Sequence, residues 1–162
     1  MKRVLILGAS SEIGRNISIQ YANDSEIILV GRSTNKLKKT QKMCYNKGAK
    51  KADIIIQDFL NPLNGQILEL YKYKFDIIIN LISGSSRMLD KDLDEELSNL
   101  IKSDVLYVIE FFNNILKKSS HQVKIIFISS ILEDIKTPNR IFYGATKSIL
   151  SVYFNNVKNN SP

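Results

Sequence analysis

A tyrosine and a lysine near the end of the chain have the types and the spacing that proton transfer requires. Tyr143 and Lys147 stand in the segment YGATK, and the i, i+4 spacing places both on one face of a helix. A tyrosine hydroxyl is ordinarily too weak an acid for this work at neutral pH, and a lysine cation one turn away stabilises its phenolate. Upstream, the run IIFISS at 125–130 is typical of a buried strand and ends in two hydroxyls. The alternative is an amphipathic helix that carries Tyr and Lys on one face by chance.

The start of the chain has the pattern of a phosphate site. The apolar run from Val4 to Leu7 is of the kind that a buried parallel strand needs, and small residues then lead into a helical pattern. A helix that follows a tight turn points free backbone N–H groups at a phosphate, with the helix dipole behind them. Gly8 permits the turn, and Gly14 lets the helix start lie close to the strand and the ligand. Glu12 would repel a phosphate unless its side chain points to solvent.

With both halves in view, the chain resembles the short-chain dehydrogenase/reductase family. The resemblance rests on GASSEIG at 8–14, on Asp58 after the third strand, and on the set Ser130, Tyr143 and Lys147. These motifs occur in the family's order over nearly the whole chain, and together they are specific. The resemblance implies an oxidoreductase that transfers hydride between a nicotinamide cofactor and a small carbonyl or alcohol. Tyr143 would exchange the proton, Lys147 would tune it and hold the ribose hydroxyls, and Ser130 would bond the substrate oxygen.

The resemblance also implies cofactor contacts at two strand ends. In the family an aspartate after the third strand meets the adenine amino group, and Asp58 matches it. A carboxylate that caps the following turn is the alternative for Asp58. Asn80 matches the first asparagine after the fourth strand, whereas Leu81 departs from the family's pattern. The residues expected to bind the cofactor are Gly8, Ser10, Ser11, Ile13, Gly14, Arg32, Asp58, Asn80, Tyr143 and Lys147.

The residue after the second strand bears on the choice of cofactor. In dinucleotide-binding folds an acidic side chain here bonds the ribose hydroxyls of NAD, whereas an arginine meets the 2′-phosphate of NADP. This chain has Arg32 at that place and no acidic residue between Ile27 and Lys42. NADP is therefore expected, with NAD the less favoured cofactor. The alternative is an Arg32 that stacks on the adenine or faces solvent.

One expected catalytic position differs from the family. Where the family carries an asparagine followed by valine, this chain has Asp104 before Val105. In the family that asparagine helps hold a water in a proton relay toward the active-site lysine. An aspartate can accept the same hydrogen bonds, but it brings a charge near Lys147. The alternative is a shifted alignment, with Asp104 purely structural.

Apolar runs and helical patterns alternate along the chain. Strands separated by helices of this length predict right-handed crossovers and a parallel sheet covered on both faces. We expect one Rossmann-like α/β domain over 1–162, doubly wound, in three α/β/α layers and with strand order 3-2-1-4-5. The expected strands are 3–8, 26–31, 53–57, 75–80 and 123–129, and the expected helices are 12–22, 34–46, 62–72, 90–117 as one or two segments, and 141–158.

Bulk properties narrow the partners and the location. The net charge is +7, but the lysines from Lys36 to Lys51 lack the interleaved aromatic residues of a base-stacking surface and indicate a solvated helix face. No apolar run approaches the ~20 residues of a membrane span. The first strand begins at once, which leaves no room for a signal peptide, and the single Cys44 has no disulfide partner. We expect a cytoplasmic protein that binds no nucleic acid, membrane or metal.

The end of the chain suggests self-association. Family members continue well beyond the YxxxK helix, whereas this chain stops at Pro162, which would leave the strand at 123–129 as an apolar edge. Apolar residues around 103–117 exceed what one buried face needs. We therefore expect a homo-oligomer formed through helices 103–117 and 141–158. The alternative to an enzyme is a truncated or degenerate family member that binds nucleotide or self-assembles without turnover.

Overall fold

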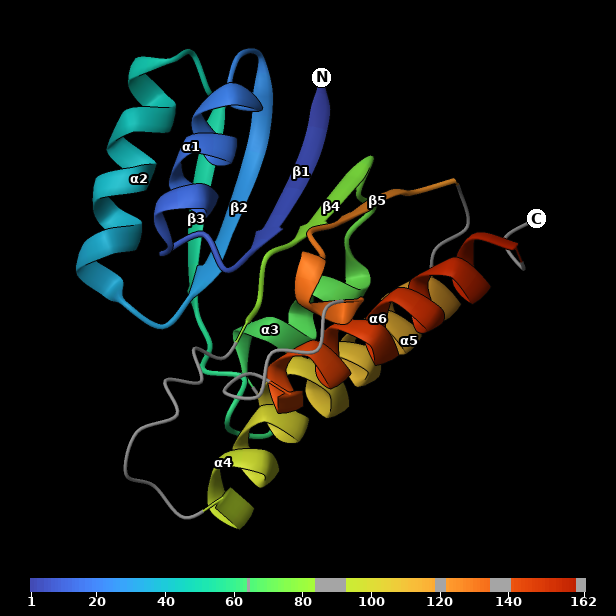
Figure 1. The fold of residues 1–162 in the computed structure, drawn as a ribbon. Helices are drawn as coiled ribbons and strands as arrows, with labels where there is room; N and C mark the ends of the chain where they lie inside the picture. Colours follow the sequence, from blue (N-terminus) through green and yellow to red (C-terminus); the bar gives the residue numbers. More distant parts are fainter. Residues whose placement is uncertain (64, 84–92, 119–121, 135–140, 160–162) are drawn as a thin grey trace.

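The computed structural model describes residues 1–63, 65–83, 93–118, 122–134 and 141–159. Within these residues the centre is a five-stranded parallel sheet in the order β3-β2-β1-β4-β5, which confirms the expected topology (Figure 1). The strands are β1 Lys2–Leu7, β2 Ser25–Gly31, β3 Lys51–Ile56, β4 Ile77–Asn80 and β5 Lys124–Phe127.

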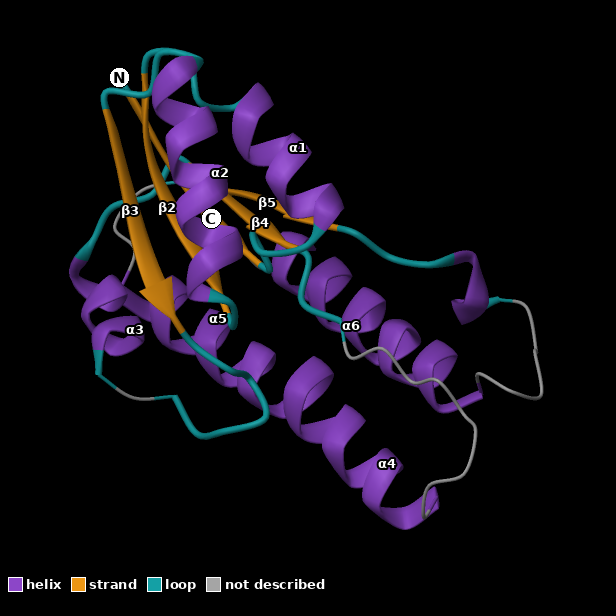
Figure 2. Ribbon diagram, turned by 90° about the vertical axis from the view of Figure 1, so that its left-hand side faces the viewer, coloured by secondary structure: helices purple, strands orange, loops and turns teal. Residues whose placement is uncertain are grey.

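Helices cover the two faces of this sheet, as the alternating pattern predicts. Two helices lie on one face and the long C-terminal pair lies on the other, while α4 extends beyond the carboxyl ends of the strands (Figures 1 and 2). Long helices between neighbouring parallel strands are the crossovers that such a sheet requires. The helices are α1 Glu12–Gln20, α2 Thr34–Asn46, α3 Gln66–Glu69, α4 Leu93–Leu100, α5 Tyr107–Lys118 and α6 Ile141–Asn159.

Burial on both faces explains the unbroken apolar run of β1. Val4 and Ile6 belong to the core on the α1 and α2 side, while Leu5 and Leu7 belong to the core that includes residues of α5 and α6. All four side chains are fully buried. Successive side chains of a strand point to opposite faces, so a strand covered twice is apolar at every position.

One expected helix starts later than predicted, and another takes the divided form that was the alternative for it. The one expected at 62–72 starts later, because Gly65 has a φ of +51°, which no α-helix accommodates. It is followed by α3 and then a 3₁₀ turn at Leu70–Lys72. The helix expected at 90–117 is α4, a π-helical segment at Ile101–Leu106, and α5. Its expected first residues, 90–92, lie outside the described residues.

β5 forms an edge of the sheet, as expected. Ile125, Ile126 and Phe127 are only half-buried, and Ile128 is 39% exposed. In the part of the chain that the structure describes, no helix combines the length and the apolar character of a membrane span.

Candidate functional site

The turn after β1 is built around contacts that leave no room for side chains. Gly8 has a φ of +88°, and its carbonyl accepts a hydrogen bond of 2.9 Å from the Ser11 hydroxyl. The same Ser11 oxygen caps α1 by accepting from the N–H of Gly14 at 2.9 Å. A Cβ on Gly14 would stand 2.8 Å from the Cα of Ala9 and would also strike the Gly8 carbonyl. The turn therefore brings the start of α1 directly against the end of β1.

This turn leaves backbone N–H groups at the start of α1. The N–H groups of Gly8 and Ala9 donate to the Val30 carbonyl, each at 2.9 Å, and so tie the turn to β2. Those of Glu12 and Ile13 fall in the first helical turn, where no intrahelical carbonyl can accept them. Ile13 therefore bears on the site through its backbone, since its side chain is 59% exposed.

A groove of about 460 Å³ opens at the carboxyl ends of β1, β2 and β3, within the usual size range of small-molecule sites. It brings together residues far apart in sequence, including five of the expected cofactor contacts. Its lining is Gly8, Ser10, Ser11, Gly31, Arg32, Gln57, Asp58, Phe59, Leu60, Leu81, Ile82, Ser83, Glu95, Asn99, Leu100 and Ser103. The expected contacts that do not line it are Ile13, Gly14, Asn80, Tyr143 and Lys147.

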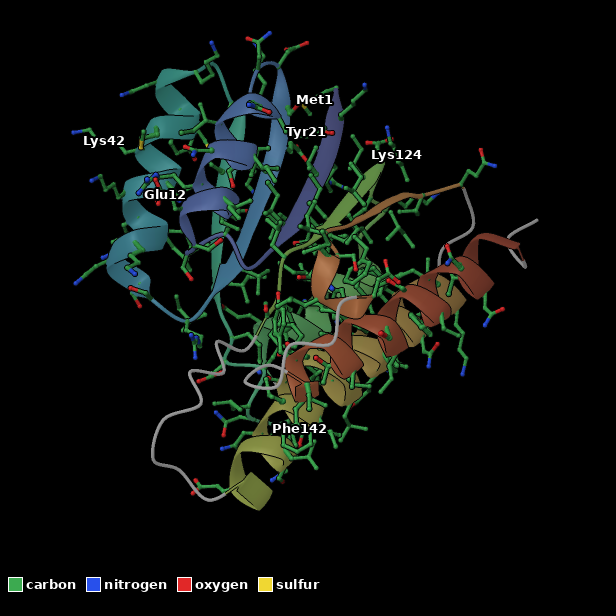
Figure 3. All side chains as sticks on the ribbon, viewed as in Figure 1. Met1, Glu12, Tyr21, Lys42, Lys124 and Phe142 are labelled. Carbon is green, nitrogen blue, oxygen red and sulfur yellow. The ribbon has the colours of Figure 1, made fainter. Side chains whose placement is uncertain are left out.

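The carboxylate of Glu12 is directed away from the groove. Its side chain is 82% exposed and lies 3.9 Å from the guanidinium of Arg15, one turn along α1. Figure 3 labels Glu12 at the start of α1 and Lys42 on the outer side of α2, among the lysines of the solvated helix face. The expected repulsion between Glu12 and a bound phosphate is therefore relieved by exposure.

Arg32 lies at the rim of the groove, directly after β2. A Cβ on the neighbouring Gly31 would stand 2.8 Å from the Ser10 hydroxyl, so the end of β2 touches the turn after β1. Arg32 is exposed and lines the groove together with Ser10 and Ser11. A cation is therefore available beside the serine-rich turn.

Asp58 and Asn80 both make local hydrogen bonds at strand ends. One carboxylate oxygen of Asp58 accepts from the N–H of Leu60 at 3.1 Å, which is the turn-capping contact considered for this residue. The residue also lines the groove, so capping and ligand contact are compatible. Asn80 is fully buried, and its side-chain oxygen accepts from the N–H of Ile82 at 3.2 Å. Asn80 thus orients the lining segment after β4.

Lys147 lies over the ring of Tyr143, as the spacing of the two residues predicts. The ammonium nitrogen is 5.5 Å from the ring centroid and donates to the carbonyl of Ile82 at 3.1 Å. Lys147 is only 2% exposed, and Tyr143 is half-buried. Ile82 itself lines the groove. The Tyr–Lys pair is therefore connected to the groove through the segment after β4.

Asp104 lies inside the π-helical segment between α4 and α5. It is fully buried, and one of its oxygens accepts from the Ser103 hydroxyl at 2.7 Å. Ser103 lines the groove. A π-segment rotates the side chains that follow it relative to a regular helix, and such segments are frequent at functional sites. Asp104 is thus the next residue in the chain after Ser103, which belongs to the groove wall.

Ser130 is linked to α6 through a 3₁₀ turn, Ile131–Glu133. Its hydroxyl oxygen accepts from the N–H of Leu132 at 3.2 Å and caps that turn. A Cβ on Gly144 would strike the Leu132 carbonyl, so the turn rests on the first turn of α6. Among the described residues no hydrogen bond joins Ser130 to Tyr143.

Some residues that line the groove could not be identified from the sequence. Glu95, Asn99 and Ser103 are spaced four residues apart along α4 and the π-segment, and they form the wall opposite the strand ends. Gln57 lines the floor beside Asp58. A polar stripe at helical spacing was visible at 95–103, but nothing in the sequence shows that this stripe faces the groove.

A doubly wound parallel sheet with a phosphate-type turn, an arginine after β2 and a groove at the strand ends defines the class of dinucleotide-binding α/β proteins. The residues present fit a nicotinamide dinucleotide, because Gly8, Gly14 and Gly31 have no room for a Cβ and so bring the turn, the start of α1 and the end of β2 together beside the groove that Arg32 lines. The chain belongs to the short chain dehydrogenase family, whose model matches residues 2–160.

Relatives and solved structures agree with that assignment. The chain is 28% identical to the hydroxysteroid 11-beta-dehydrogenase 1-like protein of Danio rerio and 26% identical to that of Gallus gallus. These matches cover 97% and 96% of this chain but only 57% of each relative.

The solved structures show the same fold. A putative short chain dehydrogenase from Escherichia coli CFT073 has a TM-score of 0.77 at 21% identity, covering 94% of this chain and 72% of that one. The bulky-bulky ketone specific alcohol dehydrogenase from Comamonas testosteroni has a TM-score of 0.78 at 16% identity, covering 97% of this chain and 66% of that one.

Proposed function

We propose that this chain is an NADP(H)-dependent oxidoreductase domain that transfers hydride to or from a small carbonyl or alcohol. The observation that carries the proposal is the placement of Lys147, which is buried over the ring of Tyr143 and bonded to the Ile82 carbonyl on the groove. A buried cation beside a phenol has little structural value in itself and is typical of a site that moves protons. The proposal treats residues 1–162 as one cytoplasmic domain.

The proposed cofactor contacts follow the groove. The first-turn N–H groups of α1, with Ser10 and Ser11 beside them, would hold the pyrophosphate. Arg32 would hold the 2′-phosphate of NADP as the cation at the end of β2. Asp58 would accept from the adenine amino group through its carboxylate. When bound, the nicotinamide supplies or accepts the hydride.

The protein's own residues would handle the proton and the substrate oxygen. In the reducing direction Tyr143 gives its hydroxyl proton to that oxygen, and the ammonium of Lys147 stabilises the phenolate that remains. Ser130 donates its hydroxyl proton in a hydrogen bond to the same oxygen, since its own oxygen is already used by the N–H of Leu132. Asp104 would accept a hydrogen bond from the water of a proton relay that leads to Lys147.

Cofactor titration tests this proposal. NADPH and NADH are titrated against the purified protein by fluorescence, and we expect NADPH to bind at least about tenfold more tightly, the size of one charge-assisted contact. Arg32→Gln should remove most of this preference, while Lys38→Gln, the same charge change on the exposed face of α2, should not. No binding of either dinucleotide would refute the proposal.

Turnover is tested on cofactor-binding protein with a panel of ketones and alcohols that includes ketosteroids. The solved alcohol dehydrogenase that acts on bulky ketones and the hydroxysteroid dehydrogenase-like relatives motivate this panel. Tyr143→Phe should abolish reduction but weaken NADPH binding far less, because Tyr143 is only one of the expected cofactor contacts. Turnover that survives in this variant would contradict the role given to Tyr143.

We also propose that two copies associate through the outer face of α6. Ile141, Ile149 and Val152 are 58%, 46% and 62% exposed, and Leu106, the last residue of the π-helical segment before α5, is 51% exposed. Exposed apolar residues repeated at helical spacing favour a helix-to-helix interface. Sedimentation should show a dimer or larger, and Val152→Lys should shift it toward the monomer. A monomer at high concentration would contradict this assembly.

A further inference from the structure

Gln57 is a buried polar residue on the floor of the groove that the proposed function does not use. It follows β3 directly, is 5% exposed and lines the groove beside Asp58. Its backbone N–H donates to the Gly31 carbonyl at 3.1 Å, which ties it to the end of β2. A buried amide has to be hydrogen-bonded to be tolerated, and its partners reveal how it is oriented.

The side-chain amide has one possible orientation. Its Nε2 donates to the carbonyl of Asp58 at 2.8 Å and to that of Asn61 at 3.4 Å. Both partners are backbone oxygens, which only accept, so the NH₂ group must face them. The Oε1 atom is the part of the amide that stays available. Because both amide hydrogens are used in these two bonds, the hydrogen-bonding capacity that Gln57 has left for a ligand in the groove is that of an acceptor.

Asp58 offers a second acceptor at the same place. Its Oδ1 is used by the N–H of Leu60, and a carboxylate has a further oxygen with free lone pairs. Glu95, on α4, also lines the groove, and its carboxylate can only accept hydrogen bonds. A ligand group seated between such side chains has to bring N–H donors, because an acceptor there would face acceptors alone.

We propose that Gln57 is a second specificity-determining residue for the base of the cofactor. Its Oε1 and the Asp58 carboxylate accept the two hydrogens of the exocyclic amino group of a 6-aminopurine. A 6-oxopurine presents a carbonyl oxygen at that point and leaves both acceptors without a partner. The groove thereby selects adenine dinucleotides over hypoxanthine dinucleotides. This inference rests on the proposed binding of a dinucleotide in the groove.

The test compares NADPH with nicotinamide hypoxanthine dinucleotide phosphate in its reduced form, by fluorescence titration. We expect the wild-type protein to favour NADPH at least about tenfold, the cost of an unpaired acceptor. Gln57→Met keeps the shape but lacks Oε1, and it should lose most of that preference. Gln41→Met is the matched control, because Gln41 also donates its amide to a backbone carbonyl, that of Ala52, but does not line the groove.

A second variant keeps the inference testable if the Gln57→Met protein does not fold. Asp58→Ala removes the carboxylate without adding a donor, so a preference for adenine that persists in it comes from Gln57. Equal binding of the two dinucleotides by wild type overturns the inference and leaves the proposed function standing. An unchanged preference in Gln57→Met, a lost preference in Gln41→Met, or no remaining preference in Asp58→Ala also overturns it. Failure of both dinucleotides to bind overturns the proposed function itself.

Discussion

The substitution Gly14→Ala tests the tight turn that forms the phosphate end of the groove. Gly14 is fully enclosed, and an added Cβ would stand 2.8 Å from the Ala9 Cα and closer still to the Gly8 carbonyl oxygen. Both neighbours are backbone atoms, so neither can rotate away. Cβ atoms in proteins keep at least 3.0 Å from such neighbours. The substitution must therefore move the start of α1 away from β1.

The expected magnitude is the balance of two effects. Alanine in place of glycine in a helix gains up to about 1 kcal/mol in propensity. Overpacking against rigid neighbours costs typically up to about 3 kcal/mol. The net loss is about 2 kcal/mol, which for a domain of this size lowers the melting temperature by about 4–8 °C. Helix propensity alone predicts the opposite sign, so the direction of the change is informative.

The assay is urea unfolding followed by far-UV circular dichroism, with Gly65→Ala as a control. A Cβ on Gly65 meets no heavy atom within 4 Å, so that variant carries only the backbone strain of its positive φ, about 1–3 kcal/mol. At low temperature, where the variant is still folded, we also expect Gly14→Ala to bind NADPH at least about tenfold more weakly, because the N–H groups in the first turn of α1 move. A Gly14→Ala protein as stable as wild type, with equal affinity for NADPH, would refute the reasoning.

Three further outcomes follow from the structure. Gly144→Ala should also destabilise the protein, because its Cβ would strike the Leu132 carbonyl. Ala145→Gly, at an exposed position in the same helical turn, measures the effect of helix propensity alone. A gain of stability in Gly144→Ala would contradict the close approach of Gly144 to Leu132. Burial raises the pKa of the Cys44 thiol to about 11, so thiol-specific labelling at pH 8 should be at least about 100-fold slower than in the unfolded chain, and rapid labelling of native protein would argue against this burial. Burial also raises the pKa of Tyr153 to about 12. The stability that the neutral Cys44 and Tyr153 groups contribute is complete below the pKa values of the unfolded chain and is lost as the pH rises toward 11 and 12. The free energy of unfolding in urea should therefore fall between pH 8 and 11, less steeply in Cys44→Ala, and a flat profile would contradict both pKa shifts.

Much of the architecture was predictable because it depends on local patterns. The continuous apolar runs at β1 and β4 indicate strands buried on both faces, and the helices between strands dictate parallel pairing. The order β3-β2-β1-β4-β5 is the one expected for the doubly wound fold. The helix boundaries that failed have local physical causes. Gly65 has a positive φ that the apolar periodicity of 62–72 conceals, and a π-segment interrupts the helical pattern at Ile101–Leu106.

What the sequence by itself determined is the set of contacts that lie within a few residues of one another. The spacing of Tyr143 and Lys147 places them on one helical face, and Ser11 and Gly14 specify a capped turn whatever the rest of the chain does. Only the tertiary structure decided that Lys147 reaches the Ile82 carbonyl, that residues of α4 line the groove, and that Gln57 lines it with its amide nitrogen bonded to the Asp58 carbonyl. The physical reason is that spacing along the chain controls local geometry through backbone periodicity, whereas the meeting of distant elements depends on how helices pack across the sheet.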